Sequence, residues 1–299
     1  MIRLDFTLDN IPYIEEGIAL TLGYFDGLHI GHLSLINEAK SSRRKSALLS
    51  FNMDGVTLKR NTLLTTLKDR EDILEKLGVD YFLVLNFSKE VMQLSPQEFV
   101  EKILRKLNVK EVIIGHDYTF GYKKSGNKDY LIYYDHRFFD VCLVPDIIRN
   151  GKKISTTYLL EELSNGNISL VNEFLTRNYK VKGKVVKGLN NGKTISYPTA
   201  NIKLSDPYAL PKNGVYFTYT IVDGIRYKSM TNIGNHPTIS PLSENIIETH
   251  IFDFSEDIYD KEIEIEFVEF LREEKKFSSL EELKEQLKKD ESYIRTSKI

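Results

Sequence analysis

The amino-acid sequence predicts an α/β protein in which a domain built on a parallel sheet is followed by a small antiparallel β-barrel and a C-terminal helix. Three observations support this prediction. Short apolar runs alternate with amphipathic helical patterns through the first half of the chain. From residue 179 onward, β-branched and aromatic residues recur between turn signals without intervening helical patterns. A charged segment with a helical pattern covers residues 279–289.

The first half consists of successive strand–helix–strand patterns. Apolar runs of strand length separated by amphipathic segments are typical of buried parallel strands joined by crossover helices. The expected strands cover residues 18–22, 47–51, 81–85, 112–114 and 139–145. The expected helices cover residues 32–40, 68–77, 96–107, 156–163 and 169–176. We therefore expect one domain at residues 1–178 and a second at 179–299.

The second half has the pattern of a small barrel. The runs 216–222 and 225–230 flank an Asp-Gly pair, which predicts a hairpin, and another turn is expected at 190–192. Further strands are expected at 249–254 and 261–271. Several antiparallel strands in succession are typical of a closed barrel.

Composition and charge exclude several classes of protein. The chain is 41% hydrophobic and 28% charged, with a mean hydropathy of -0.30 and a formal net charge of -2. The chain therefore lacks the excess of basic residues that is typical of nucleic-acid binding. The sequence also contains no apolar run long enough to cross a membrane. The start of the chain has no signal-peptide pattern, and one cysteine excludes an internal disulfide. We expect a cytoplasmic protein.

The most informative motif lies between the first expected strand and the first expected helix. Residues 22–32 read LGYFDGLHIGH, so that His29 and His32 flank Gly31. A helix that begins after a tight turn presents unpaired amides and the positive end of its dipole, which together bind anions. Two imidazoles there can donate hydrogen bonds to phosphate oxygens. This arrangement suits a nucleotidyltransferase. The alternative for either histidine is a helix cap or a core position.

A second candidate motif is YPTAN at residues 197–201. In extended backbone, the Thr199 hydroxyl and the Asn201 amide share one side, where both suit Mg²⁺ or phosphate, although a simple Pro-led turn is the alternative. The segment GLNNGKT, which begins at Gly188, resembles a phosphate-binding loop but is one residue short and lies in an all-β region, so we reject that interpretation. Zinc is also disfavoured, because the histidines are scattered and Cys142 stands alone.

Taken in order, the motifs resemble those of the bacterial bifunctional riboflavin kinase/FAD synthetase family over nearly the whole chain. Three segments resemble motifs of the family's Rossmann-like FMN adenylyltransferase module, a nucleotidyltransferase: 23–32, 115–121 and 154–157. Five segments resemble motifs of its riboflavin kinase barrel: 198–201, 214–216, 232–234, 248–254 and 271–277. So many ordered matches are more specific than any one of them.

The resemblance implies roles for individual residues. His29 and His32 would steady the α- and β-phosphates of ATP during adenylyl transfer. Glu248 would take the proton from the riboflavin 5′-hydroxyl, and Thr199 and Asn201 would hold the metal that bridges the ATP phosphates. The other residues that the resemblance places at ATP or its phosphates are Gly23, Phe25, Asp26, Gly31, Ser155, Thr156, Gly183 and Gly188. Those that it places at the flavin or nucleotide are Asp117, Phe120 and Arg272.

The chain departs from the family pattern at several positions. Leu160 stands where the third motif of the first module usually has an arginine, and leucine cannot replace a guanidinium that clamps phosphate, so slower adenylyl transfer is expected. The segment 52–55 lacks the expected turn with proline and histidine. In the barrel, Ser196 replaces a glycine and His236 replaces an arginine, whereas the residues expected to perform the chemistry are present.

The leading interpretation is a two-site enzyme that phosphorylates riboflavin to FMN with ATP and then adenylylates FMN to FAD, with release of pyrophosphate. Mg²⁺ would accompany ATP, no nucleic acid or membrane is expected as a partner, and weak self-association is left open. One alternative keeps a single activity, foremost the kinase, with the first domain reduced to a weak or inactive adenylyltransferase or a flavin-responsive regulatory module. Another keeps only the histidine motif, in a transferase acting on a nicotinamide, pantetheine or choline phosphate.

Overall fold

The computed structural model describes residues 1–53, 62–134, 138–187, 197–235 and 245–298. The chain divides into two compact units, Met1–Thr156 and Thr157–Ile299. The change in sequence pattern lies later, at residue 179, because two helices intervene, α6 (Thr156–Ser164) and α7 (Ile168–Leu175). Helix α7 packs on strands of the second unit. One contact of this kind is the hydrogen bond from Asn172 Nδ2 to the Phe267 carbonyl, 2.8 Å long.

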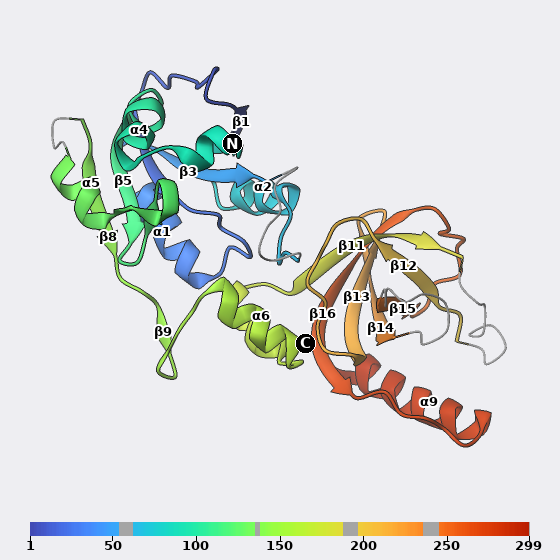
Figure 1. Ribbon diagram of the computed structural model, residues 1–299. Coiled ribbons are helices and arrows are strands. Elements are labelled where there is room, and N and C mark those ends of the chain that lie inside the picture. Colours follow the sequence, from blue (N-terminus) through green and yellow to red (C-terminus); the bar gives the residue numbers. More distant parts are fainter. Residues whose placement is uncertain (54–61, 135–137, 188–196, 236–244, 299) are drawn as a thin grey trace. The chain divides into compact units, whose positions relative to one another are not determined.

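The first unit is built on a six-stranded sheet in which every neighbouring pair is parallel (Figure 1). The strands, in spatial order, are β1 (Ile2–Phe6), β4 (Tyr81–Asn86), β3 (Lys45–Asn52), β2 (Ile18–Leu22), β5 (Val109–Gly115) and β8 (Asp140–Val144). The sequence-based expectation of a parallel sheet is confirmed, but β1 was not predicted. Its burial is incomplete because it lies at the edge of the sheet.

Apolar clusters cover both faces of this sheet. Leu48 and Phe82 belong to the cluster beneath α1 (Ile30–Ser41) and α2 (Leu67–Lys76), whereas Leu49 and Leu83 belong to a cluster with Val100 on the other face. Because both faces are buried, the central strands are apolar throughout. The helical elements of this unit are α1 (Ile30–Ser41), α2 (Leu67–Lys76), α3 (Lys89–Gln93), α4 (Pro96–Phe99), the π-helix η1 (Val100–Leu104), the 3₁₀-helix η2 (Tyr122–Lys124) and α5 (Lys128–Tyr134).

The strand order creates a switch point beside β2. The chain runs from β2 to β3 on one side, and β5 then pairs with the other side of β2. In such sheets, ligands bind outside the carboxyl ends of the strands at this point, because the connections leave in opposite directions there. The turns that follow β2 and β5 therefore lie at the expected ligand crevice. Short antiparallel pairs extend the loops: β6 (Thr119–Phe120) with β7 (Gly126–Asn127), and β9 (Ile148–Arg149) with β10 (Lys152–Lys153).

The second unit contains a closed barrel of antiparallel strands, as predicted. In spatial order these are β11 (Tyr179–Val186), β12 (Ala200–Leu204), β15 (Asn245–Ile251), β14 (Ile225–Asn235), β13 (Gly214–Val222) and β16 (Glu262–Arg272). The predicted hairpin joins β13 to β14, with Asp223 and Gly224 at φ angles of 51° and 81°. Two successive positive φ angles are the turn geometry that favours Asp-Gly.

The barrel interior combines apolar side chains with a cluster of buried hydroxyls. The Thr231 Oγ1 atom lies 2.7 Å from Thr218 Oγ1 and donates a 2.9 Å hydrogen bond to Thr249 Oγ1. Ser229 and Thr220 complete this cluster, which is wholly buried. The hydroxyl cluster is thus a polar part of the core in which the members hydrogen-bond to one another.

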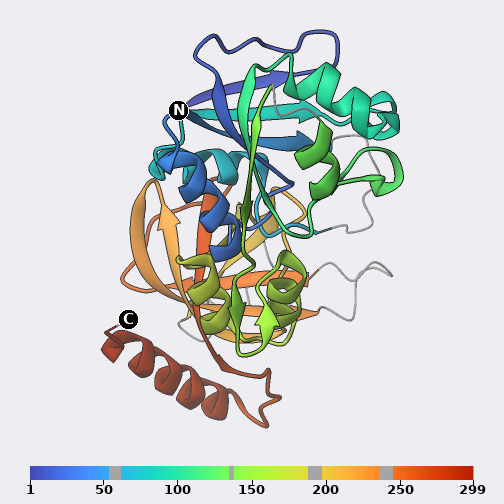
Figure 2. The same ribbon diagram turned by 90° about the vertical axis from the view of Figure 1, so that its left-hand side faces the viewer.

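Helix α9 (Leu280–Thr296) follows the last strand and lies outside the barrel wall (Figure 2).

Candidate active sites in the two units

The two histidines of the first motif stack on each other at the start of α1. Their ring centroids are 3.7 Å apart with an interplanar angle of 19°, and Phe25 meets His32 edge-on at 5.1 Å. His29 is the N-cap residue of α1. Gly31 leaves space between them, because a Cβ there would approach the His29 ring at 3.1 Å. The imidazoles thus lie where the helix dipole and the first-turn amides favour an anion.

His32 is uncharged at neutral pH. Burial, followed by the charges of His29 and Arg70, holds the pKa of His32 well below its ordinary value of 6.5. Its Nδ1 atom is buried and has no hydrogen-bond partner among the described residues. A neutral imidazole carries one N–H, so an Nδ1 acceptor leaves Nε2–H as the donor. His32 therefore offers phosphate oxygens an N–H group rather than a fixed positive charge.

Asp26 and Arg70 hold the turn before α1 in place. The Asp26 carboxylate accepts hydrogen bonds from the amides of Leu64 and Thr65, at 2.9 and 2.8 Å. Arg70 is 1% exposed and donates to the Tyr24 carbonyl at 2.7 Å and to the hydroxyl of β3 residue Ser50 at 2.8 Å. Asp26 was predicted to lie at phosphate, but its carboxylate instead binds backbone amides of the protein itself.

The three predicted motifs of the first unit converge. The Thr156 hydroxyl donates a 3.0 Å hydrogen bond to the Asp26 carbonyl, which joins the third motif to the first. Lys153, which directly precedes the third motif, forms ion pairs with Asp117 of the second motif at 2.6 Å and with Asp146 at 2.8 Å. The hydrogen bond from Lys153 holds the pKa of Asp117 below its ordinary value. Ser155 lies between Lys153 and Thr156, so all three motifs meet at this edge.

Several predicted ligand-binding residues are packed into the protein instead. Phe25 and Phe120 are 2% and 6% exposed and belong to apolar clusters. A Cβ at Gly23 would lie 3.2 Å from the Phe25 ring, and a Cβ at Gly183 would overlap Ile202 and Lys203 of the neighbouring strand. These glycines therefore allow close packing, and the aromatic rings support the turns that carry the polar residues.

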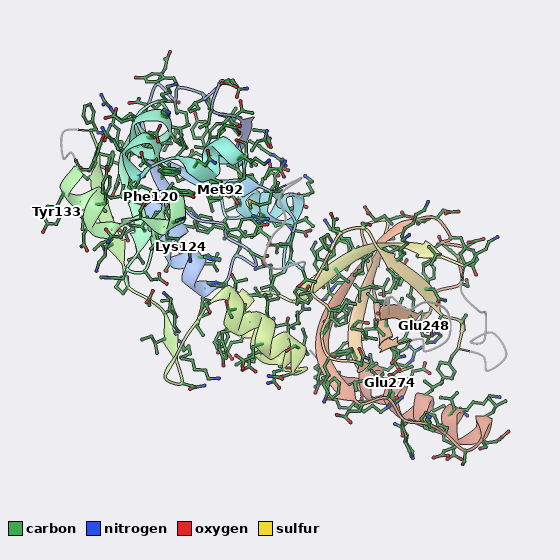
Figure 3. All side chains as sticks on the ribbon, in the orientation of Figure 1. Met92, Phe120, Lys124, Tyr133, Glu248 and Glu274 are labelled. Atoms are coloured by element: carbon green, nitrogen blue, oxygen red, sulfur yellow. The ribbon has the colours of Figure 1, made fainter. Side chains whose placement is uncertain are left out.

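In the second unit, Glu248 lies in a row of residues across the outer face of the barrel. The β-ladders pair Glu248 with Asn201 of β12 on one side and with Asn232 of β14 on the other. Residues that pair directly have their side chains on the same face. The carboxylate of Glu248 has no hydrogen-bond or ion-pair partner within the described residues, and Figure 3 labels its position on β15. A half-buried carboxylate between two amides is suited to accept a proton from a bound hydroxyl.

The same row continues to Arg272. Asn232 pairs with Val215 of β13, which pairs with Arg272 at the end of β16. Arg272 forms a 2.8 Å ion pair with Asp290 of α9, and its guanidinium lies 5.9 Å from the Phe277 ring centroid. Arg272, predicted to contact flavin or nucleotide, thus fixes the segment after β16 against α9.

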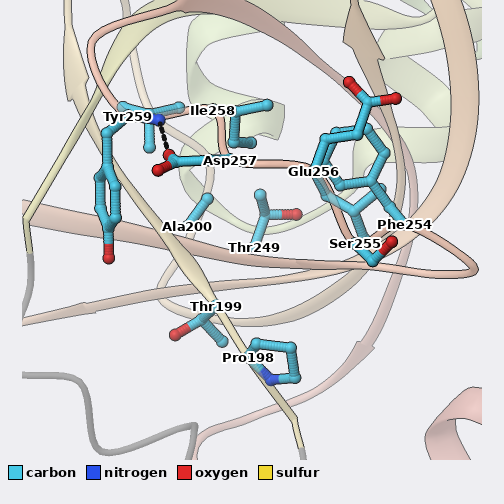
Figure 4. Close-up of a pocket in the computed structure, with 12 residues that line it drawn as sticks. Pro198, Thr199, Ala200, Thr249, Phe254, Ser255, Glu256, Asp257, Ile258 and Tyr259 are labelled. Carbon is cyan, nitrogen blue, oxygen red and sulfur yellow. Dashed lines mark hydrogen bonds between the residues drawn. The ribbon is translucent and has the colours of Figure 1, made fainter.

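Thr199 borders a cavity of about 310 Å³ (Figure 4). Ala200, Thr249 and Ile251 belong to its wall, and the loop of residues 254–259 closes it. The amide of Tyr259 donates a 3.0 Å hydrogen bond to Asp257 in this loop. The lining combines apolar side chains with the Thr199 hydroxyl and the acidic Glu256 and Asp257, a mixture that suits a heterocycle joined to polar groups.

The predicted phosphate-binding residue Gly188 lies outside the described residues, as do the two departures from the family pattern, Ser196 and His236, and the turn expected at 190–192. Among the side chains that the structure describes, no group of three or more His, Cys, Asp or Glu could hold a metal ion. No helix in the described segments is long and apolar enough to cross a bilayer.

Sequence reasoning missed Arg70, the hydroxyl cluster and the loop of residues 254–259. Arg70 lies in a charged helix, where nothing in the sequence separates a buried arginine from an exposed one. The hydroxyl residues look like ordinary strand formers. Only the alternation of threonines with larger residues at 217–220 would have suggested that one face of β13 is polar.

Comparison with protein families identifies both units. The FAD synthetase family model matches residues 11–158, and the riboflavin kinase family model matches residues 175–298. A bifunctional riboflavin kinase/FMN adenylyltransferase from Listeria monocytogenes serovar 1/2a is 36% identical, covering 98% of this chain and 96% of its own. The enzyme of the same name from Bacillus subtilis is 34% identical, covering 91% of this chain and 89% of its own.

A solved structure shares the whole fold. A crystal structure from Streptococcus pneumoniae, described as that of a macrolide-efflux protein, is 29% identical with a TM-score of 0.90. The match covers 99% of this chain and all of the other one. The arrangement of a parallel-sheet unit followed by a barrel unit is therefore found in a second chain of matching extent.

Proposed function

The chain belongs to the family of bifunctional riboflavin kinase/FMN adenylyltransferases, and we propose from this that it converts riboflavin to FAD in two steps on two separate sites. The barrel unit phosphorylates riboflavin to FMN with ATP. The parallel-sheet unit transfers an adenylyl group from a second ATP to FMN. The observation that supports both steps most strongly is the presence in one chain of the stacked His29–His32 pair and the Glu248 row.

In the adenylyl step, an oxygen of the FMN phosphate attacks the α-phosphorus of ATP, and the bond from that phosphorus to the pyrophosphate oxygen breaks. Two anions must approach each other for this to happen. His29 and His32 lower the cost of that approach, because their N–H groups donate hydrogen bonds to the phosphates and the positive end of the α1 dipole lies beside them. Asp26 and Arg70 keep the turn in place, so that the imidazoles need little reorganisation during the reaction.

In the kinase step, the riboflavin 5′-oxygen attacks the γ-phosphorus of ATP, and ADP leaves. Glu248 takes the hydroxyl proton as the new bond forms. The Asn201 and Thr199 side chains offer the oxygen ligands that Mg²⁺ prefers, and we propose that they hold the magnesium bound to ATP. That ion neutralises charge on the phosphates. The cavity beside Thr199 takes the nucleotide, with its base against the apolar part of the lining around Ile251 and Phe254.

Three further parts of the proposal concern the setting of the enzyme. Both steps consume ATP, which supports the cytoplasm as the place of reaction. We propose only weak self-association. The boundary between the two functional modules falls at residue 178/179, since β11 is the first strand of the barrel. The alternative of a kinase with an inactive first unit rests on Leu160, which stands in α6 where an arginine is expected.

A chromatographic time course tests the proposal. Purified protein is incubated with riboflavin, ATP and Mg²⁺, and a parallel reaction begins from FMN. FMN followed by FAD supports both steps. FMN without FAD would leave only the kinase, and no flavin product from either start would overturn the proposed function.

A further inference from the structure

Glu274 is held beside the proposed kinase base by an amide. The Nδ2 atom of Asn232 donates a 3.1 Å hydrogen bond to Glu274 Oε1, and Asn232 is the strand neighbour of Glu248. Figure 3 labels both carboxylates in the barrel unit. Facing residues on paired strands have Cβ atoms about 5 Å apart, so the two carboxylates lie within reach of one short polyol chain.

The orientation of the Asn232 amide is set by Glu274. Its Oδ1 atom is buried and has no hydrogen-bond partner among the described residues. An unpaired buried acceptor such as this Oδ1 atom costs free energy. The charge-assisted hydrogen bond from the Nδ2 atom of the same amide to Glu274 offsets that cost. The site also has space for the carboxylate, because a Cβ at position 234 would overlap Glu274 Oε1. Gly234 and Asn232 thus form a seat for Glu274.

The carboxylate in this seat is exposed and available. Its two sequence neighbours form ion pairs, Glu273 with Lys212 at 2.6 Å and Lys275 with Glu282 at 3.2 Å. Glu274 forms no ion pair within the described segments, and Asn232 is its hydrogen-bond partner there. An ionised carboxylate only accepts hydrogen bonds, and its two oxygens can accept from adjacent hydroxyls of one ligand.

We propose that Glu274 accepts hydrogen bonds from the secondary hydroxyls of the ribityl chain while Glu248 deprotonates the 5′-hydroxyl. This inference rests on the proposed kinase function and adds a determinant of specificity to it. A flavin that lacks these hydroxyls covers the Glu274 carboxylate and supplies it no donor, so that among the described residues only the hydrogen bond from Asn232 remains. Asn232 acts as the positioning residue, since it fixes the carboxylate against the barrel.

The test compares riboflavin with flavins whose ribityl chain lacks one secondary hydroxyl. Hydrogen bonds to charged groups predict that the wild type prefers riboflavin over at least one analogue by about 10- to 100-fold in kcat/KM for FMN formation. In Glu274→Ala, this preference should fall below about 3-fold because the acceptor is gone. Glu273→Ala is the matched control and should keep the wild-type preference. Quenching of flavin fluorescence gives the same ratios as dissociation constants, including for variants with low activity.

Two results would overturn the inference. If the wild type makes FMN and Glu274→Ala keeps the full preference for riboflavin over the analogue, Glu274 does not bind the ribityl hydroxyls. The proposed kinase function is unaffected by that result. If Glu273→Ala loses the preference as much as Glu274→Ala does, the effect belongs to the segment and not to this carboxylate. A wild type that makes no FMN would remove the proposed function and this inference together.

Discussion

His29 and His32 stack with ring centroids 3.7 Å apart at the start of α1, and Phe25 meets the second ring edge-on. The arrangement follows from the sequence, because His29 caps the helix and His32 lies in its first turn. Stacking limits the rotation of both rings. The pair is therefore held in one arrangement at the helix N-terminus before any ligand arrives.

Removal of either imidazole should affect one reaction only. His29→Ala or His32→Ala should lower the rate of FAD formation from FMN by about 10²- to 10³-fold, the range for loss of one donor to a developing charge. FMN formation from riboflavin serves as the internal control and should change little. A variant that loses both activities equally would indicate a folding defect instead of a phosphate contact.

The lowered pKa of His32 predicts a pH dependence of stability. Below the ordinary value of 6.5, His32 binds a proton in the unfolded chain but not in the folded one. Protons therefore favour unfolding, and stability is lost as the pH falls, by up to about 1.4 kcal/mol per pH unit. Hydrogen exchange in β2 and α1 between pH 7.5 and 5.5 measures this, with His32→Asn as the control. An equal slope in the two proteins would contradict the assignment.

Arg70 should be a positioning residue for the first site. Arg70→Met removes the buried donor that the Tyr24 carbonyl and the Ser50 hydroxyl share, and leaves them only the 2.9 Å hydrogen bond from Ser50 to Tyr24, at a cost of about 1–3 kcal/mol. We expect weaker protection of β2 and α1 in hydrogen exchange and slower FAD formation, with FMN formation retained. Unchanged protection would show that the turn is held without Arg70. Exposed Lys68 on the same helix provides a control in Lys68→Met.

The hydroxyl cluster in the barrel predicts a non-additive pair of substitutions. Thr231→Val removes partners of Thr218 and Thr249, and should cost about 1–2 kcal/mol in the free energy of unfolding. Combining it with Thr218→Val should cost less than the sum of the two single changes, since both ends of one bond are then removed. Urea unfolding of the four proteins measures the coupling. Strict additivity would mean that the two hydroxyls do not depend on each other.

Much of the fold could be predicted from the sequence, because buried parallel strands and Asp-Gly hairpins leave strong local signals. The edge strand β1 and the π-helix η1 could not, since they depend on packing at the sheet edge and on the burial of Val100, Ile103 and Leu104 in the core. The polar site residues were found through motifs. Their partners were not: Arg70 contacts Ser50 across 20 positions, and Glu274 contacts Asn232 across 42. Such contacts exist only once the strands are in register.

The most direct test of the central claim, two independent sites in one chain, is a flavin time course on three proteins. The wild type should convert riboflavin to FMN and then to FAD. Glu248→Gln should lose FMN formation by about 10²- to 10⁴-fold yet still make FAD when supplied with FMN, because it lacks only the proton acceptor. His29→Ala should show the reverse. If Glu248→Gln fails to make FAD from FMN, or His29→Ala fails to make FMN from riboflavin, the two reactions are not separate.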